Sequence, residues 1–73
     1  MEFALSSGKD YIQLNQLIKL LGITETGGIA NQIISDGEVV VNGNTEKQKR
    51  KKLFAGDKVE IGELKILITA SEN

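Results

Sequence analysis

The chain contains no histidine and no cysteine. These absences exclude disulfides, thiolate metal sites and the side chain that most often acts as general base or zinc ligand. The serines therefore have no histidine partner, and the carboxylates are scattered along the chain. We expect a protein that is not an enzyme, binds no small-molecule substrate and has no cofactor or metal.

Long apolar runs are also missing. The longest, such as Val39 to Val41, are far below the ~20 residues that a membrane helix needs. The N-terminus lacks the basic and then apolar pattern of a secretory signal. We expect a cytoplasmic protein without a membrane partner, and the length of 73 residues favours a single domain over residues 1–73.

Positive charge is concentrated in one segment. The net charge is only −1, yet five of the nine basic residues lie within six positions, and these are Lys47, Lys49, Arg50, Lys51 and Lys52. The other 67 residues carry four basic and ten acidic groups, a net charge of −6. The chain is thus an acidic body with one compact basic segment, a distribution that the average conceals.

Two amphipathic helices are predicted in the first half. Leu14, Leu17, Ile18 and Leu21 recur at the spacing of one helix face, and Gly22 is a natural stop. Thr26 is a suitable N-cap for a second helix that ends at Gly37. The apolar face of this second helix would comprise Ala30, Ile33 and Ile34, with Ile29 at its edge.

Short strands are predicted on both sides of the helices. Residues 2–5 alternate between polar and apolar, and residues 38–41 are β-branched before Asn42-Gly43, a strong hairpin signal. Further strands are expected over residues 44–46, 58–61 and 64–68, with Leu53 and Phe54 entering the core. The result is an α+β fold in which two helices pack on a small, mostly antiparallel sheet.

A fixed spacing links a larger set of these residues: Leu14, Asn15, Ile18, Gly22, Thr26, Ala30, Ile33, Ile34, Gly37, Val39, Val41, Asn42 and Gly43, followed by Gly56-Asp57. This pattern, over about residues 12–61, resembles the "S-four" RNA-binding domain, also called the αL motif. The Thr-Gly-Gly-x-Ala variant and the flanking strands are similar to its stand-alone bacterial branch, the YaaA/YbcJ type. The resemblance implies binding to structured RNA, with ribosomal RNA or transfer RNA as leading candidates and the ribosome or a ribosomal subunit as a further partner.

The sequence departs from that family at several basic positions. Many members carry Arg after the Ser or Thr of the second helix, and Lys or Arg after its Ala, where this chain has Gly27 and Asn31. Gln13 likewise stands where many have Arg. Electrostatic binding should then come largely from the basic segment, which can contact several phosphates and release their counterions.

The candidate RNA-binding residues are Lys47, Lys49, Arg50, Lys51, Lys52, Thr26, Gly27, Gly28, Asn31, Gln32, Gln13, Asn15 and Lys19. The start of the second helix offers free N–H groups to a phosphate, and glycines there permit close approach. Each group also fits a simpler role. The basic segment could be a solvated loop, Thr26-Gly27-Gly28 an N-cap with glycines for helix packing, and the polar residues of the first helix an ordinary solvent face. Tyr11 could stack on a base or belong to the core.

Two other functions fit the sequence. A protein-interaction module could use the neutral helix face and an edge strand at Leu64 to Ile68, because lysine-rich loops also bind acidic protein surfaces. Non-specific DNA binding is the other alternative. We expect Asn42-Gly43 and Gly56-Asp57 to serve only in turns.

Overall fold

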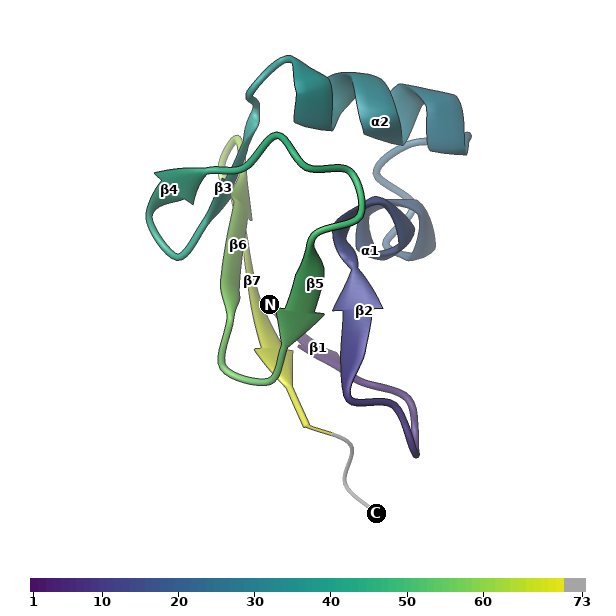
Figure 1. Cartoon of the computed structure of the whole chain (residues 1–73), viewed down its shortest axis with the longest axis vertical. Helices are drawn as coiled ribbons and strands as arrows, with labels where there is room; N and C mark the ends of the chain where they lie inside the picture. Colours follow the sequence, from purple (N-terminus) through teal and green to yellow (C-terminus); the bar gives the residue numbers. More distant parts are fainter. Residues whose placement is uncertain (71–73) are drawn as a thin grey trace.

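The computed structural model describes residues 1–70, and these form two helices and seven short strands (Figure 1). In chain order the elements are β1 (Glu2–Ala4), β2 (Tyr11–Gln13), α1 (Leu14–Leu20), α2 (Gly27–Ser35), β3 (Val39–Val41), β4 (Asn44–Thr45), β5 (Lys52–Phe54), β6 (Lys58–Ile61) and β7 (Leu64–Thr69). The predicted α+β class is confirmed. Neither helix within residues 1–70 is long and apolar enough to cross a membrane.

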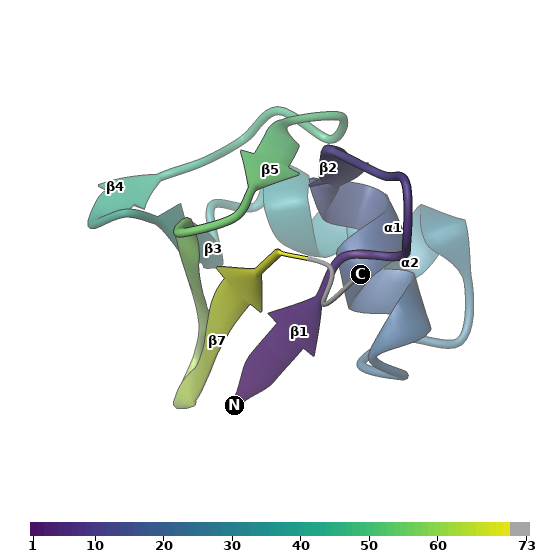
Figure 2. The same cartoon turned by 90° about the horizontal axis from the view of Figure 1, so that it is seen from below.

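The strands form two sheets of different size. The larger has the order β1-β7-β6-β3-β4, in which β1 and β7 are parallel and the other neighbours are antiparallel. The smaller is the antiparallel pair of β2 and β5. Seen from below, the larger sheet and the two helices lie on opposite sides of the molecule, and the small sheet runs across the top of the view, with β2 over α1 (Figure 2). The predicted mostly antiparallel arrangement is therefore confirmed.

The core lies between the helices and the strands. Its buried side chains are Leu5, Leu14, Leu17, Ile18, Ala30, Ile34, Val39, Val41, Leu53, Val59, Ile66 and Ile68. Its members lie in α1, α2, β3, β5, β6 and β7, apart from Leu5, which directly follows β1; Ile12 of β2 packs against the set. Burial of this apolar surface is the main favourable term that holds two short helices onto short strands.

The predicted helix boundaries rest on local chemistry that the structure confirms. The hydroxyl of Thr26 accepts a hydrogen bond from the N–H of Ile29, at 3.2 Å, and so caps α2. Gly22 and Gly37 follow the two helices with φ angles of 73° and 80°, where a side chain would be strained. Ile29 is 51% exposed, as its place at the edge of the apolar face predicted.

The Asn42-Gly43 turn and the Gly56-Asp57 turn are tied together by side chains. Asn42 donates to the Asp57 carboxylate at 3.0 Å and accepts from the backbone N–H of Lys58 at 2.9 Å. The same carboxylate accepts from the N–H of Phe54 at 2.8 Å. These bonds hold the β3–β4 hairpin against the turn that enters β6, in agreement with the structural role expected of both dipeptides.

Two sequence predictions are wrong, and one strand was missed. Phe54 does not enter the core: it is 47% exposed, because its neighbour Leu53 points inward and successive residues of a strand face opposite sides. Residues 64–68 are not an edge strand, since β7 has β1 on one side and β6 on the other. The short strand β2 was not predicted, although it leads directly into α1.

Candidate nucleic-acid interface

The basic segment, residues 47–52, connects β4 to β5 and begins β5 with Lys52. Four of its five cationic side chains are exposed, and Lys51 is half-buried. The segment also has internal bonds: the N–H of Lys51 donates to the carbonyl of Gln48, and the N–H of Gln48 donates to the Glu46 carboxylate. The cations therefore project from a backbone with a defined course.

The start of α1 is bound to this segment. The N–H of Leu14 donates to the carbonyl of Lys51 at 2.9 Å, and the N–H of Asn15 donates to the carbonyl of Lys49 at 3.0 Å. Gln13, at the N-cap position, provides no side-chain bond to the helix. Two N–H groups that a helix normally leaves unpaired are thus satisfied by the basic segment, which fixes the segment against α1.

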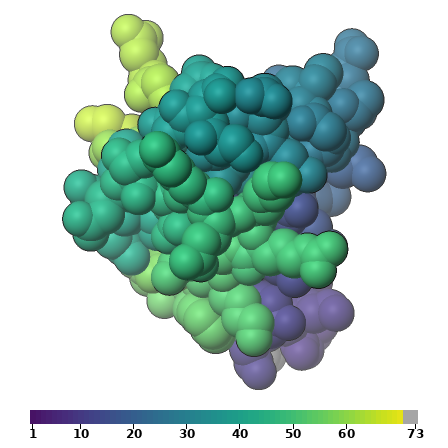
Figure 3. All heavy atoms as spheres, turned by 45° about the horizontal axis from the view of Figure 1, so that its top comes forward, coloured from purple at the N-terminus to yellow at the C-terminus, as the bar shows by residue number. Residues whose placement is uncertain are grey.

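The same segment lies beside α2. Asn15, which contacts the carbonyl of Lys49, has its side-chain nitrogen 3.5 Å from the side-chain oxygen of Asn31. At the end of α2, a Cβ on Gly37 would lie 3.4 Å from the Lys47 side chain. Figure 3 shows the green basic segment and the teal helix α2 next to each other on one face of the molecule. The segment therefore borders the middle and end of α2.

The N-terminal end of α2 lies close to the part of the helix that borders the basic segment. Gly28 is three residues before Asn31, which at 1.5 Å per residue is about 4.5 Å along the axis. The two glycines of this turn have no packing role, because a Cβ on Gly27 would meet nothing within 4 Å and one on Gly28 only the Thr26 hydroxyl at 3.8 Å. This excludes the expected alternative in which these glycines serve tight helix packing.

Other predicted residues lie at different places on this surface. The side-chain amide of Gln32 donates to Asp36 at 2.8 Å, so a negative charge lies next to it. Lys19 is exposed and one helical turn after Asn15. Gln13 pairs across the small sheet with Lys52, so the two side chains emerge on the same face.

An exposed aromatic pair adjoins the basic segment; the sequence suggested Tyr11 as a possible stacking residue but did not pair it with Phe54. Tyr11 and Phe54 face each other across β2 and β5, with ring centroids 5.8 Å apart and planes tilted by 50°. The Lys52 ammonium lies 4.9 Å from the Tyr11 ring centroid. The alternation in Tyr11-Ile12-Gln13 and Lys52-Leu53-Phe54 was the available signal, but nothing in the sequence pairs the two strands.

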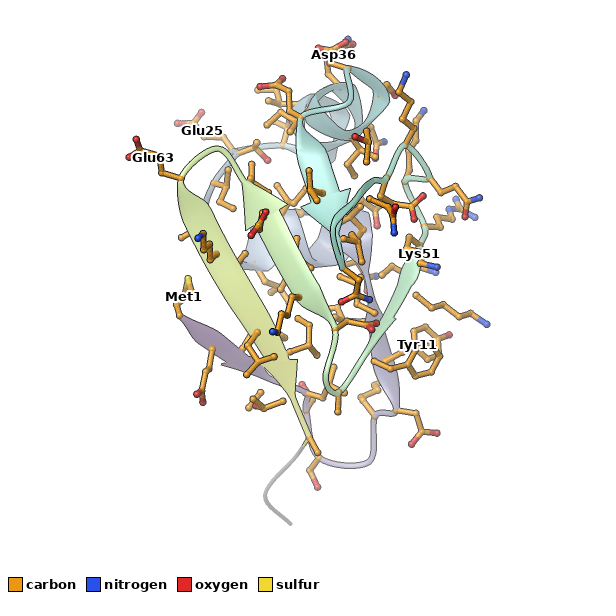
Figure 4. All side chains as sticks on the ribbon, turned by 90° about the vertical axis from the view of Figure 1, so that its left-hand side faces the viewer. Met1, Tyr11, Glu25, Asp36, Lys51 and Glu63 are labelled. Carbon is orange, nitrogen blue, oxygen red and sulfur yellow. The ribbon has the colours of Figure 1, made fainter. Side chains whose placement is uncertain are left out.

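Charge is distributed unequally around the molecule. In Figure 4, Tyr11 and Lys51 project from one side, whereas Glu25 and Glu63 lie on the opposite side. A surface with cations on an ordered backbone, amide side chains and the first N–H groups of α2 suits an anionic, hydrogen-bonding polymer better than an apolar ligand.

The chain belongs to the S4 domain family, because the model of that family matches residues 4–69. A relative in Bacillus subtilis (strain 168), RlbA, is 37% identical over 57 residues, which cover 78% of this chain and 80% of RlbA. RlbA bears the provisional name of a ribosome maturation protein.

YbcJ of Escherichia coli (strain K12), provisionally named an RNA-binding protein, is 35% identical over 60 residues, covering 82% of this chain and 86% of YbcJ. Its solution structure matches with a TM-score of 0.70 and 33% identity over 94% of this chain and 86% of that one. That structure is described as revealing an αL motif involved in RNA binding. The expected resemblance to the αL-motif family and its stand-alone bacterial branch is confirmed.

Proposed function

We propose that this protein is a non-catalytic, single-domain binder of structured RNA that holds the phosphate backbone between its basic segment and helix α2. The observation that carries the proposal is the double anchoring of the basic segment to the first turn of α1. Cations on an ordered backbone lose less conformational freedom when they bind than cations on a free loop.

The polar groups beside the segment extend the same surface. The amides of Asn15 and Asn31 can donate to phosphates or to 2′-hydroxyl groups, and the latter are found in RNA but not in DNA. The N–H groups of Gly27 and Gly28 offer a further phosphate contact at the positive end of the α2 dipole. Such contacts recognise the shape of a folded RNA more than its sequence.

Ribosomal RNA and transfer RNA are the leading candidates for the ligand, with the ribosome or one of its subunits as a wider partner. The names of the relatives support this choice, since one is provisionally a ribosome maturation protein and the other an RNA-binding protein. Because these RNAs are cytoplasmic in bacteria, we place the protein there as well.

Binding to a structured RNA tests the proposal directly. Replacing Lys49, Arg50, Lys51 and Lys52 with Ala should weaken binding to all RNAs to a similar degree and flatten the dependence of affinity on salt. A quadruple variant that is folded and binds as tightly as the wild type would refute the proposed mode. Crosslinking in cells, followed by sequencing of the bound RNA, then distinguishes ribosomal from transfer RNA.

A protein partner is the second candidate function. Leu20 and Ile29, one on each helix, are 68% and 51% exposed, which favours some apolar contact. Pull-down with and without nuclease separates the two functions. A partner that survives nuclease treatment supports protein binding, and one that is lost supports RNA binding. Equal-length RNA and DNA duplexes in competition test the DNA alternative.

A further inference from the structure

The outer face of the small sheet carries an exposed aromatic cluster. Tyr11 and Phe54 are 38% and 47% exposed, although large aromatic side chains are costly to leave in water. Their strand neighbours Ile12 and Leu53 point the other way, into or against the core. The two rings are therefore presented on the surface by the alternation of β2 and β5, and the core does not use them.

The cluster is continuous with the basic segment. Lys52 is both the last cation of that segment and the residue whose ammonium lies 4.9 Å from the Tyr11 ring centroid. Gln13 pairs with Lys52 across the strands, immediately before the α1 turn that binds the segment. A chain whose phosphates contact the segment would bring its neighbouring nucleotide to these rings.

A hollow of about 470 Å³ adjoins Tyr11 and lies within the range of roughly 300–1,000 Å³ that is common for small-ligand pockets. Its lining combines apolar side chains with the polar groups of Asp10, Gln13 and Gln16. A nucleobase needs both features, since it has an apolar face and hydrogen-bonding edges. Tyr11 lines the hollow, whereas Lys52 and Phe54 do not.

We propose that Tyr11, supported by Phe54, is a stacking platform for an unpaired base of the RNA whose backbone lies on the basic segment. This inference rests on the proposed RNA-binding function and adds single-stranded recognition to it. Stacking of a base on an aromatic side chain strengthens binding by about 5- to 150-fold. The exposed contact of Lys52 with the ring is worth only about 2- to 5-fold. This contact therefore does not prevent stacking: a base on the same face of the ring displaces the Lys52 ammonium, and a base that stacks from the hollow leaves it in place.

The experiment compares two RNAs and three proteins. One RNA is a blunt hairpin. The other is the same hairpin with one four-nucleotide single-stranded extension, which carries 2-aminopurine and is placed at the 5′ end or at the 3′ end. The proteins are the wild type, Tyr11→Phe, which keeps the ring, and Tyr11→Leu, which keeps only apolar bulk. Because the chain has no tryptophan, excitation of 2-aminopurine near its red edge avoids protein emission.

The wild type and Tyr11→Phe should bind the extended hairpin at least about fivefold more tightly than the blunt one. Their binding should also quench 2-aminopurine emission, as stacking does. Tyr11→Leu should bind both hairpins with the affinity of the wild type for the blunt one, without quenching. Thermal unfolding checks that each variant is folded, and Phe54→Leu provides a second variant if Tyr11→Leu is not.

Three results overturn the inference in distinguishable ways. If the wild type binds both hairpins equally and without quenching, RNA binding stands but the platform does not exist. If the wild type binds neither hairpin at low salt, the proposed function fails and the platform fails with it. An extended hairpin preferred equally by wild type and by folded Tyr11→Leu also contradicts the platform, because the preference then comes from another part of the surface.

Discussion

Asn42 is the residue on which the two turns of the larger sheet depend. Its φ angle is 51°, a conformation that Asn tolerates better than most residues, and its side chain bonds to both Asp57 and Lys58. One residue thus combines a backbone requirement with a cross-link between segments 15 positions apart.

Substitutions at Asn42 can separate these two contributions. Asn42→Ala loses the hydrogen bonds and strains the backbone, so we expect a loss of about 1–3 kcal/mol in the free energy of unfolding. Asn42→Gly loses only the bonds, because Gly accepts positive φ, and should be the less destabilised variant. Urea unfolding followed by circular dichroism measures both. Equal stability of wild type and Asn42→Ala would show that the cross-link contributes nothing.

Gly27 and Gly28 allow a test in which stability and binding change in opposite directions. Neither residue has positive φ, and neither is crowded, so alanine fits at both. The double variant Gly27→Ala/Gly28→Ala should be more stable by up to about 1 kcal/mol per site, because alanine favours helix.

The same variant should bind RNA about tenfold more weakly or worse, since the methyl groups obstruct N–H groups that would otherwise bond a charged phosphate. Unfolding and filter-binding measurements on one preparation give both values. A variant that gains stability and keeps its full affinity would remove the start of α2 from the interface.

At the scale of elements, the sequence predicted what depends on neighbouring residues. Both helices and the β3–β4 hairpin follow from local signals: helical spacing of Leu14 to Leu21, the Thr26 cap and the Asn42-Gly43 turn. The pairing of β2 with β5 joins residues about 40 positions apart, and short strands carry no mark of their partner.

For the candidate site, too, the sequence predicted the local features and missed those that depend on distant parts of the chain. The five cations could be counted in the sequence, but their place against α1 depends on backbone carbonyls of Lys49 and Lys51, which have no side-chain signature. The aromatic pair was missed for a related reason, because Phe54 reaches the surface only through the orientation of β5.

The positive charges of the basic segment should contribute most to RNA binding. The effect of their position can be separated from the effect of net charge by two variants that lose equal charge at different places. Lys49→Gln/Arg50→Gln and Lys58→Gln/Lys65→Gln each remove two positive charges, the first pair from the segment and the second from β6 and β7. If Lys49 and Arg50 each contact a phosphate, the first variant should flatten the slope of log affinity against log salt by about 1.4–1.8. Its affinity at 0.1 M salt should fall by about 25- to 60-fold.

The second variant is the matched control and should bind nearly as the wild type does. Similar losses in both variants would mean that the protein responds to RNA through overall charge, without a defined surface. Fluorescence anisotropy with a labelled hairpin over a salt series supplies the affinities and the slopes.

At the scale of the whole molecule, a chain of 73 residues has little stability to spare. A domain of this size buries only about 60% of its unfolded surface, so its free energy of unfolding should be a few kcal/mol. A ligand that binds only the folded state then changes the melting temperature strongly.

Structured RNA at 100 times its dissociation constant should add about 2.7 kcal/mol of stability. For a domain of this length, that raises the melting temperature by roughly 10–20 °C. Differential scanning calorimetry measures the shift, provided that the RNA melts at a higher temperature than the protein. The Lys49→Gln/Arg50→Gln variant should show a smaller shift at the same RNA concentration, and an RNA that leaves the wild-type transition unmoved would not be a ligand.

The central claim is that one face, made by the basic segment, the start of α1 and the α2 surface around Asn31, holds the RNA backbone. Amide chemical shifts in a titration of the ¹⁵N-labelled protein with a structured RNA hairpin test it most directly. The account predicts the largest changes at Asn15, Asn31 and Lys49 to Lys52, and little change at Glu60, Glu63 and Lys65. Changes concentrated on β6 and β7 instead, with the basic segment unaffected, would contradict it.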